Sequence, residues 1–125
     1  MATTVDGVAA ADVARPGDVD GVREIVRSVA ARSGAAIVPT GLGAHLDVGA
    51  PPRRVDVLLD LRALARIVDH EAADMTVTVQ AGCSLAELET TLAAAGQWLP
   101  LDPPAFERTT IGGLVAANLS GPLRA

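Results

Sequence analysis

The chain has 125 residues, half of them hydrophobic and a fifth charged, and its formal net charge at pH 7 is −5. This length suits one domain with a real core, and the acidic balance argues against a nucleic-acid backbone as the main partner. No apolar run is long enough to span a bilayer, no paired Cys/His spacing suggests a metal site, and the single cysteine, Cys83, excludes an internal disulfide, so we expect a soluble cytoplasmic protein.

The first part of the chain predicts a strand, a helix and a second strand. Residues 1–12 are small and mildly apolar and are expected to be poorly ordered, so the folded domain is expected to span 13–125. After a Pro-Gly turn, Asp18 is a helix N-cap, and the apolar residues at helical spacing behind it predict a helix that Gly34 ends: Val22, Ile25, Val26, Val29 and Ala30. Residues 36–38 predict the next strand, and such a crossover unit places its two strands parallel.

Residues 39–49 form a glycine-rich loop directly after this strand. Its glycines, Gly41, Gly43 and Gly49, can take positive φ angles and leave their N–H groups uncovered because they have no Cβ. Successive bare N–H groups form a concave nest that suits an anion such as a pyrophosphate. The alternative is an ordinary glycine-rich surface turn.

The middle of the chain predicts three further strands. Residues 55–60 form one, and residues 66–70 and 75–79 form a hairpin connected by 71–74. In the last strand polar threonines alternate with an apolar set, as in a half-buried strand: Met75, Val77 and Val79.

A helix follows at Ser84, which with Glu87 forms a capping box. The helix ends at Gly96 and has an apolar face of Leu85, Leu88, Leu92 and Ala95. Cys83, just before the cap, is expected to be a small buried thiol, the alternative being a thiolate of low pKa at the helix start.

The last predicted element is a helix that Thr109 or Thr110 caps and that runs to Asn118. Its first turn contains Gly112 and Gly113, at a cost of about 1 kcal/mol each in helix propensity. One interpretation is that free N–H groups at this helix start make a second site that contacts an anion or a ring. The other is tight packing of the helix against a strand.

These motifs together resemble a known family. The glycine-rich loop is followed by Gln80-Ala81-Gly82, by residues 99–104 with Asp-Pro-Pro at their end, and by Thr-Ile-Gly-Gly at 110–113. From about Ala14 onward the chain resembles the N-terminal part of the FAD-binding domain of the vanillyl-alcohol oxidase and p-cresol methylhydroxylase (PCMH) superfamily, and most of all the FAD-binding subunit of glycolate oxidase.

The resemblance implies an α+β (α/β) fold, the first lobe of a PCMH-type FAD-binding domain with a small mixed sheet and packed helices. It implies that the second lobe and the substrate domain are absent from this chain. It also implies FAD as the cofactor, whose pyrophosphate is held by main-chain amides of Thr40, Gly41, Leu42, Gly43, Ala44 and His45. It implies that the other side of the cofactor is lined by Pro103, Thr110, Gly112, Gly113, Asn118 and Gly121.

The chain departs from the family pattern in the first loop. Many members have an arginine, further glycines or Thr/Ser there, where this chain has Thr40, Leu42 and Ala44, which leaves fewer side-chain contacts to phosphate. The position of His45 does not match that of the histidines to which some relatives attach flavin covalently, so His45 is expected to be a hydrogen-bonding or solvent-facing loop residue. No catalytic residue and no metal ligand is assigned to the chain.

The function that the resemblance implies is the FAD-binding part of an oxidoreductase that transfers a hydride from a 2-hydroxy acid such as glycolate to the flavin. The isolated chain is expected to be inactive and to bind FAD weakly or not at all. Two alternatives stay open: a non-catalytic FAD- or nucleotide-binding half that needs a partner chain, and a structural remnant without cofactor. Expected partners are other oxidase subunits or a second copy, with no nucleic acid and no membrane span.

Overall fold

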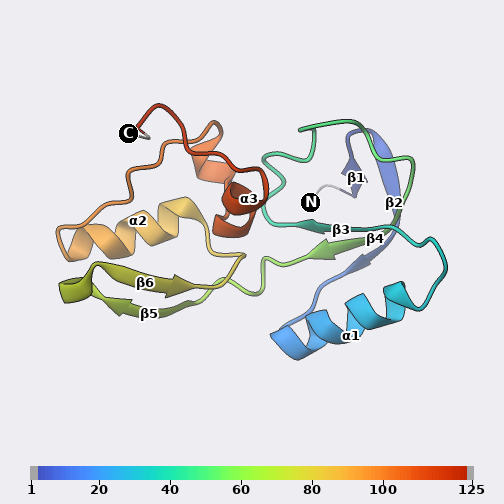
Figure 1. Cartoon of the computed structure of the whole chain (residues 1–125), viewed down its shortest axis with the longest axis horizontal. Coiled ribbons are helices and arrows are strands. Elements are labelled where there is room, and N and C mark those ends of the chain that lie inside the picture. The colour runs from blue at the N-terminus through green and yellow to red at the C-terminus, as the bar shows by residue number, and fades with distance from the viewer. Residues whose placement is uncertain (1–2, 124–125) are drawn as a thin grey trace.

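The computed structural model describes residues 3–123 and divides them between two small sheets, with α3 at the junction (Figure 1). In Figure 1 the larger sheet lies on one side with α1 beneath it, and a hairpin lies on the other beneath α2. The strands are β1 (Thr4–Val5), β2 (Val8–Ala14), β3 (Ile37–Thr40), β4 (Val55–Asp60), β5 (Ile67–Glu71) and β6 (Thr76–Val79). The helices are α1 (Val19–Ala30), α2 (Leu85–Ala94) and α3 (Ile111–Ala116), with 3-10 turns at Ala72–Asp74 and Phe106–Arg108.

The larger sheet is mixed, in the order β1-β2-β4-β3. β2 and β3 are parallel as predicted, but they are not neighbours, because β4 lies between them and pairs with both. Helix α1 makes the crossover and begins where the sequence predicts, since the Asp18 side chain accepts a 2.7 Å hydrogen bond from the Gly21 N–H. It ends at Ala30, and Gly34 takes its positive φ of 66° in the turn beyond.

The N-terminal segment differs from the expectation of disorder. From Thr4 onward it is a hairpin whose two-residue turn, Asp6-Gly7, has positive φ at both positions. An Asp-Gly pair favours this turn, and the strand before it buries Val5 against Val55 and Leu58. Apolar burial and strand pairing therefore order residues that the composition predicted to be poorly ordered. Residues 1–2 lie outside the described residues.

The smaller sheet is the antiparallel hairpin of β5 and β6, covered by α2. Val77 and Val79 face the buried cluster as predicted, but Met75 does not: it takes a left-handed φ of 54° at the end of the turn and is 82% exposed. The Ser84 hydroxyl caps α2 through the Glu87 N–H at 3.1 Å, as the capping box predicts.

Helix α2 buries the three leucines of its predicted face, Leu85, Leu88 and Leu92. Burial of each stabilises the fold by about 1.5–3 kcal/mol relative to exposure. Ala95, the fourth predicted member, lies past the last helical residue and is exposed. Cys83 is buried in the same cluster, and burial raises the pKa of its thiol, which argues against the thiolate alternative.

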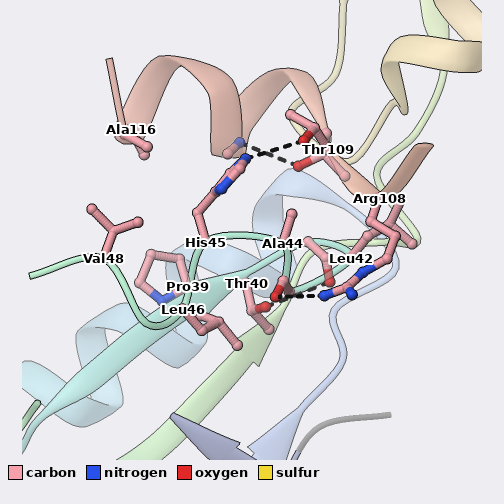
Figure 2. Close-up of a pocket in the computed structure, with 15 residues that line it drawn as sticks. Pro39, Thr40, Leu42, Ala44, His45, Leu46, Val48, Arg108, Thr109 and Ala116 are labelled. Atoms are coloured by element: carbon pink, nitrogen blue, oxygen red, sulfur yellow. Dashed lines mark hydrogen bonds between the residues drawn. The ribbon is translucent and has the colours of Figure 1, made fainter. Parts of the chain in front are cut away.

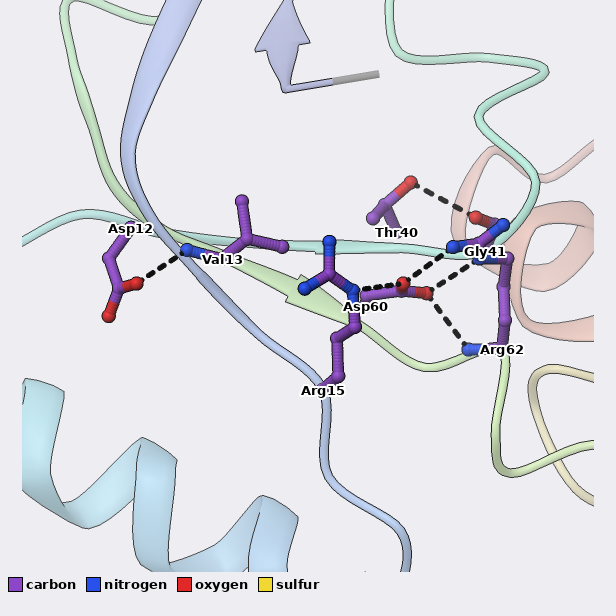
Figure 3. A network of polar contacts seen from close by, with 7 residues as sticks. All are labelled: Asp12, Val13, Arg15, Thr40, Gly41, Asp60 and Arg62. Carbon is purple, nitrogen blue, oxygen red and sulfur yellow. Dashed lines mark hydrogen bonds and ion pairs between the residues drawn. The ribbon is translucent and has the colours of Figure 1, made fainter. Parts of the chain in front are cut away.

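The carboxyl ends of β2, β3 and β4 meet at one edge of the larger sheet, where the glycine-rich loop begins. Asp60, the last residue of β4, lies at this edge and is 3% exposed. Arg62 donates to both of its carboxylate oxygens at 2.9 Å, and the Arg15 Nε atom lies 3.4 Å from the Asp60 Oδ2 atom (Figure 3). The hydrogen bonds from Arg62 lower the pKa of the Asp60 carboxyl. The Leu61 N–H donates to the Thr40 carbonyl at 2.9 Å, so this ionic cluster lies at the base of the loop.

Candidate functional site

A pocket of about 230 Å³ lies between the glycine-rich loop and the segment around α3 (Figure 2). One wall consists of residues 39–46 and 48. The other consists of residues 108–110, 113, 116 and 117. The two segments that the sequence singled out, far apart in the chain, therefore face each other across a cavity.

The first wall contains a row of consecutive main-chain N–H groups that have no acceptor among the described residues. Within residues 3–123, none of the N–H groups of residues 41–45 donates a hydrogen bond to the protein. Gly43, at φ 76°, gives the loop a bend that other residues rarely adopt. Main-chain N–H groups need an acceptor, so consecutive unpaired ones beside a cavity suit an anion with several oxygens.

The second wall has no such row, although it also contains two glycines. The Ile111 and Gly112 N–H groups each donate at 2.8 Å, to the carbonyls of Cys83 and Ala81, and the Gly113 N–H donates to the Thr110 hydroxyl at 3.2 Å. The prediction of free N–H groups at this helix start is therefore wrong.

Tight packing, the other interpretation of this glycine pair, holds for Gly112. A Cβ on Gly112 would lie 2.9 Å from both the Cβ and the carbonyl oxygen of Ala81. The helix start lies against the chain that leads out of β6, and a side chain at this position would separate them.

Three contacts join the walls. In the first, the Gly41 main chain packs directly against the Thr110 side chain, since a Cβ on Gly41 would lie 2.4 Å from the Thr110 hydroxyl oxygen. The His45 Nε2 atom lies 3.1 Å from the hydroxyl oxygen of Thr109, which is 1% exposed. Since that hydroxyl donates its own proton to the Ala105 carbonyl at 3.0 Å, we assign Nε2 as the donor. His45 is thus a hydrogen-bonding loop residue.

The third contact comes from Arg108, whose Nη2 atom lies 3.5 Å from the Gly43 carbonyl oxygen (Figure 2). Arg108 and His45 are the ionisable side chains among the described residues that line the pocket, and no carboxylate is among them. The chain as a whole has a net charge of −5, whereas the pocket lining within residues 3–123 contains no negatively charged side chain. The donor row and the charge both fit a phosphate-containing group.

The structure does not gather all the predicted site residues. Thr40, Gly41, Leu42, Gly43, Ala44, His45, Thr110 and Gly113 line the pocket, and Gly112 lines an adjoining recess of about 220 Å³ with Leu61 and Ala81. Pro103, Asn118 and Gly121 line neither; Pro103 is buried, and a Cβ on Gly121 would lie 2.2 Å from the Asp102 carbonyl oxygen.

Seven residues of the lining were not predicted as site residues, namely Arg108, Thr109, Ala116 and Ala117 on the second wall and Pro39, Leu46 and Val48 on the first. The first of these directly precedes the Thr-Thr-Ile-Gly-Gly motif, which was a usable signal. Its approach to Gly43, 65 positions away, depends on the tertiary fold. In the described part of the chain, no group of three or more His, Cys, Asp or Glu side chains is placed to hold a metal ion.

The fold places two glycine segments on opposite sides of one pocket, an arrangement that suits a phosphate-containing ligand. Residues 10–125 match the model of the family described as FAD binding domain, and the chain belongs to that family. This confirms the resemblance drawn from the motifs and identifies FAD as the cofactor of the family.

Relatives of known name support the same assignment. The chain is 35% identical over 109 residues to the D-2-hydroxyglutarate dehydrogenase of Xanthomonas citri, a match that covers 87% of this chain and 23% of that protein. It is 40% identical over 67 residues to the glycolate oxidase subunit GlcE of Escherichia coli, covering 53% and 19%. A solved structure of alkyldihydroxyacetonephosphate synthase matches with a TM-score of 0.70 at 28% identity, over 83% of this chain and 20% of that one. The chain thus spans about a fifth of the length of these proteins.

None of the helices between residues 3 and 123 has the length and apolar character needed to cross a membrane.

Proposed function

We propose that the pocket receives the diphosphate of FAD and that the N–H groups of residues 41–45 are its main donors. The observation that carries this proposal is the unpaired row of donors on a wall without carboxylates. FAD, when bound, supplies the redox chemistry, and this chain supplies position and electrostatics. Thr110 and Gly113 on the second wall then make van der Waals contact with the cofactor and do not bind it through free main-chain N–H groups.

The pocket holds only part of the cofactor. Its volume of about 230 Å³ lies below the range of roughly 300–1,000 Å³ that is usual for sites enclosing a whole drug-sized ligand. Leu42 and Val48, which line the pocket, are exposed, so its rim is uncovered and apolar. We therefore expect the 125-residue chain to bind FAD weakly or not at all, and a sub-micromolar affinity by isothermal titration would refute this.

Amide proton–nitrogen correlation NMR on the same chain tests the donor row directly. Inorganic diphosphate at millimolar concentration is the probe, because it carries the anionic group without the rest of the cofactor. We expect the resonances of residues 41–45 to shift and those of 111–113, whose N–H groups are already bonded, to stay. If the first group does not move, or if both groups move alike, the assignment of the donors is wrong.

We further propose that the complete enzyme oxidises a 2-hydroxy acid such as glycolate by hydride transfer to the flavin. The support is the chemistry in the names of two relatives, a 2-hydroxyglutarate dehydrogenase and a glycolate oxidase subunit. The test is dye reduction by the protein purified from its native cells with any bound partners, with glycolate, D-lactate and D-2-hydroxyglutarate as substrates. Acetate, propionate and glutarate lack the 2-hydroxyl group and are the matched controls. Equal rates with both sets, or no reduction by any hydroxy acid, would contradict the proposal.

A second candidate is a non-catalytic FAD-binding half that acts only with a partner, which would be another oxidase subunit or a second copy. The observation that favours it is the apolar surface near the pocket, where Val48 is 64% and Val115 is 73% exposed. Purification from native cells distinguishes the two. Bound flavin with a co-purifying chain but without hydroxy-acid turnover supports this second candidate.

A further inference from the structure

The proposed diphosphate site has many neutral donors and little charge. Main-chain N–H groups supply only partial charges, and His45 is the one ionisable side chain that the loop contributes to the pocket lining, since Asp47 of the same loop is not among the lining residues. A diphosphate carries at least two negative charges near neutral pH, so a fixed cation beside the loop would add much to its binding. Arg108, from the opposite wall, is the candidate for that cation.

Arg108 is available for an incoming anion. Among residues 3–123, the ion pairs of arginine with aspartate involve Arg15, Arg23, Arg54 and Arg62, and Arg108 has none. Its 3.5 Å contact with the Gly43 carbonyl is at the outer limit of a hydrogen bond and is easily exchanged. An exposed guanidinium held this weakly costs little to redirect.

The main chain of Arg108 is nevertheless firmly placed. Its N–H donates to the Ala105 carbonyl at 2.8 Å, which closes the short 3-10 turn. The next residue, Thr109, is buried, and its carbonyl accepts a 3.0 Å hydrogen bond from the Leu85 N–H at the start of α2. The base of the side chain is therefore fixed at a position from which the guanidinium reaches the Gly43 carbonyl of the loop.

We propose that Arg108 is the phosphate-contacting side chain of this pocket and that its guanidinium moves from the Gly43 carbonyl onto the oxygens of the bound diphosphate. The planar head can donate two parallel hydrogen bonds to one phosphate group. In this chain Arg108 supplies, from the opposite wall, a side-chain phosphate contact that Leu42 and Ala44 of the loop cannot make. The inference rests on the proposed diphosphate site.

The test compares the NMR-derived affinity for inorganic diphosphate among four proteins: the unchanged chain, Arg108→Gln, Arg108→Lys and Arg27→Gln. Gln keeps a donor for the Gly43 carbonyl but removes the charge. Arg27 lies on α1, away from the pocket, so Arg27→Gln makes the same change in net charge elsewhere. We expect Arg108→Gln to weaken binding about tenfold or more, Arg108→Lys to recover part of the loss, and Arg27→Gln to bind as the unchanged chain does.

The salt dependence of the affinity provides a second measurement that a purely structural role would not change. Added salt should weaken diphosphate binding to the unchanged chain more than to Arg108→Gln, because the variant has lost the local charge that salt screens. If Arg108→Gln binds as tightly as the unchanged chain, the role of Arg108 is refuted while the diphosphate site stands. If the unchanged chain shows no shift at residues 41–45, the proposed site fails and the role of Arg108 fails with it.

Discussion

The two glycine segments of this chain face each other across one pocket, yet they use glycine for opposite purposes. In the loop, the N–H groups of residues 41–45 have no partner within the described protein and are free to bind an external acceptor. At the start of α3, the N–H groups of Ile111 and Gly112 are bonded to main-chain carbonyls, and Gly112 is a place of close contact. One segment exposes its main chain, and the other packs it.

The surroundings, rather than the glycines, account for this difference. The start of α3 passes directly over the segment that leaves β6, whose carbonyls at Ala81 and Cys83 are aimed at it. The loop leaves the carboxyl edge of the larger sheet, beyond the last pair of β3 and β4, where no further strand of residues 3–123 offers acceptors. A glycine-rich motif therefore marks an anion site only when nearby carbonyls do not already satisfy its N–H groups.

Gly41→Ala should have the largest effect, because it acts where the two segments touch. The new Cβ would lie 2.4 Å and 2.7 Å from the two branches of the buried Thr110 side chain, which also caps α3. We expect a loss of about 2–3 kcal/mol in the free energy of unfolding, measured by urea denaturation. Gly17→Ala is the matched control, since nothing lies within 4 Å of its Cβ, and it should change stability by less than about 0.5 kcal/mol. Equal losses of unfolding free energy in both variants would show that Gly41 and Thr110 are not in close contact.

The sequence alone predicted the elements whose signals are local. The caps at Asp18, Ser84 and Thr110 each accept the expected hydrogen bond, because a cap and its acceptor geometry lie within one turn. β4 spans Val55–Asp60, as predicted. The Asp6-Gly7 hairpin was equally local and was missed, because the composition of the N-terminus was given more weight than its turn pair.

The remaining features could not be predicted because they depend on contacts between distant segments. The acceptors for the first N–H groups of α3 are about thirty residues upstream, so the sequence left two interpretations of Gly112 open. β4 lies between β2 and β3 through pairings with strands that are distant in the sequence. The approach of Arg108 to Gly43 spans 65 positions and has no periodic signal.

Gly112→Ala sharpens the comparison from the packed side. The new Cβ would meet the Cβ and the carbonyl oxygen of Ala81, both at 2.9 Å, and these atoms can move only with the backbone, although alanine regains about 1 kcal/mol of helix propensity. We expect a net loss of about 1–2 kcal/mol in unfolding free energy by urea denaturation, with diphosphate binding by the folded protein unchanged. The control is Gly113→Ala, whose Cβ would meet only the Thr110 hydroxyl, at 3.3 Å, and should cost less. A variant of normal stability that no longer binds diphosphate would assign Gly112 to the site instead.

An effect on stability no larger than that of Gly112→Ala, and the sharpest separation of the two uses of glycine, should come from Gly43→Ala paired with Gly96→Ala. Both residues have positive φ, 76° and 69°, and neither would place a Cβ closer than 3.5 Å to a neighbour. Alanine should therefore cost each position a similar strain of about 1–2 kcal/mol in unfolding free energy. Only Gly43 belongs to the donor row, so only Gly43→Ala should weaken diphosphate binding in the NMR titration. If both variants lose stability equally and both still bind diphosphate as the unchanged chain does, the left-handed bend at Gly43 is not needed for anion binding. Gly43 would then have to be removed from the proposed set of donors.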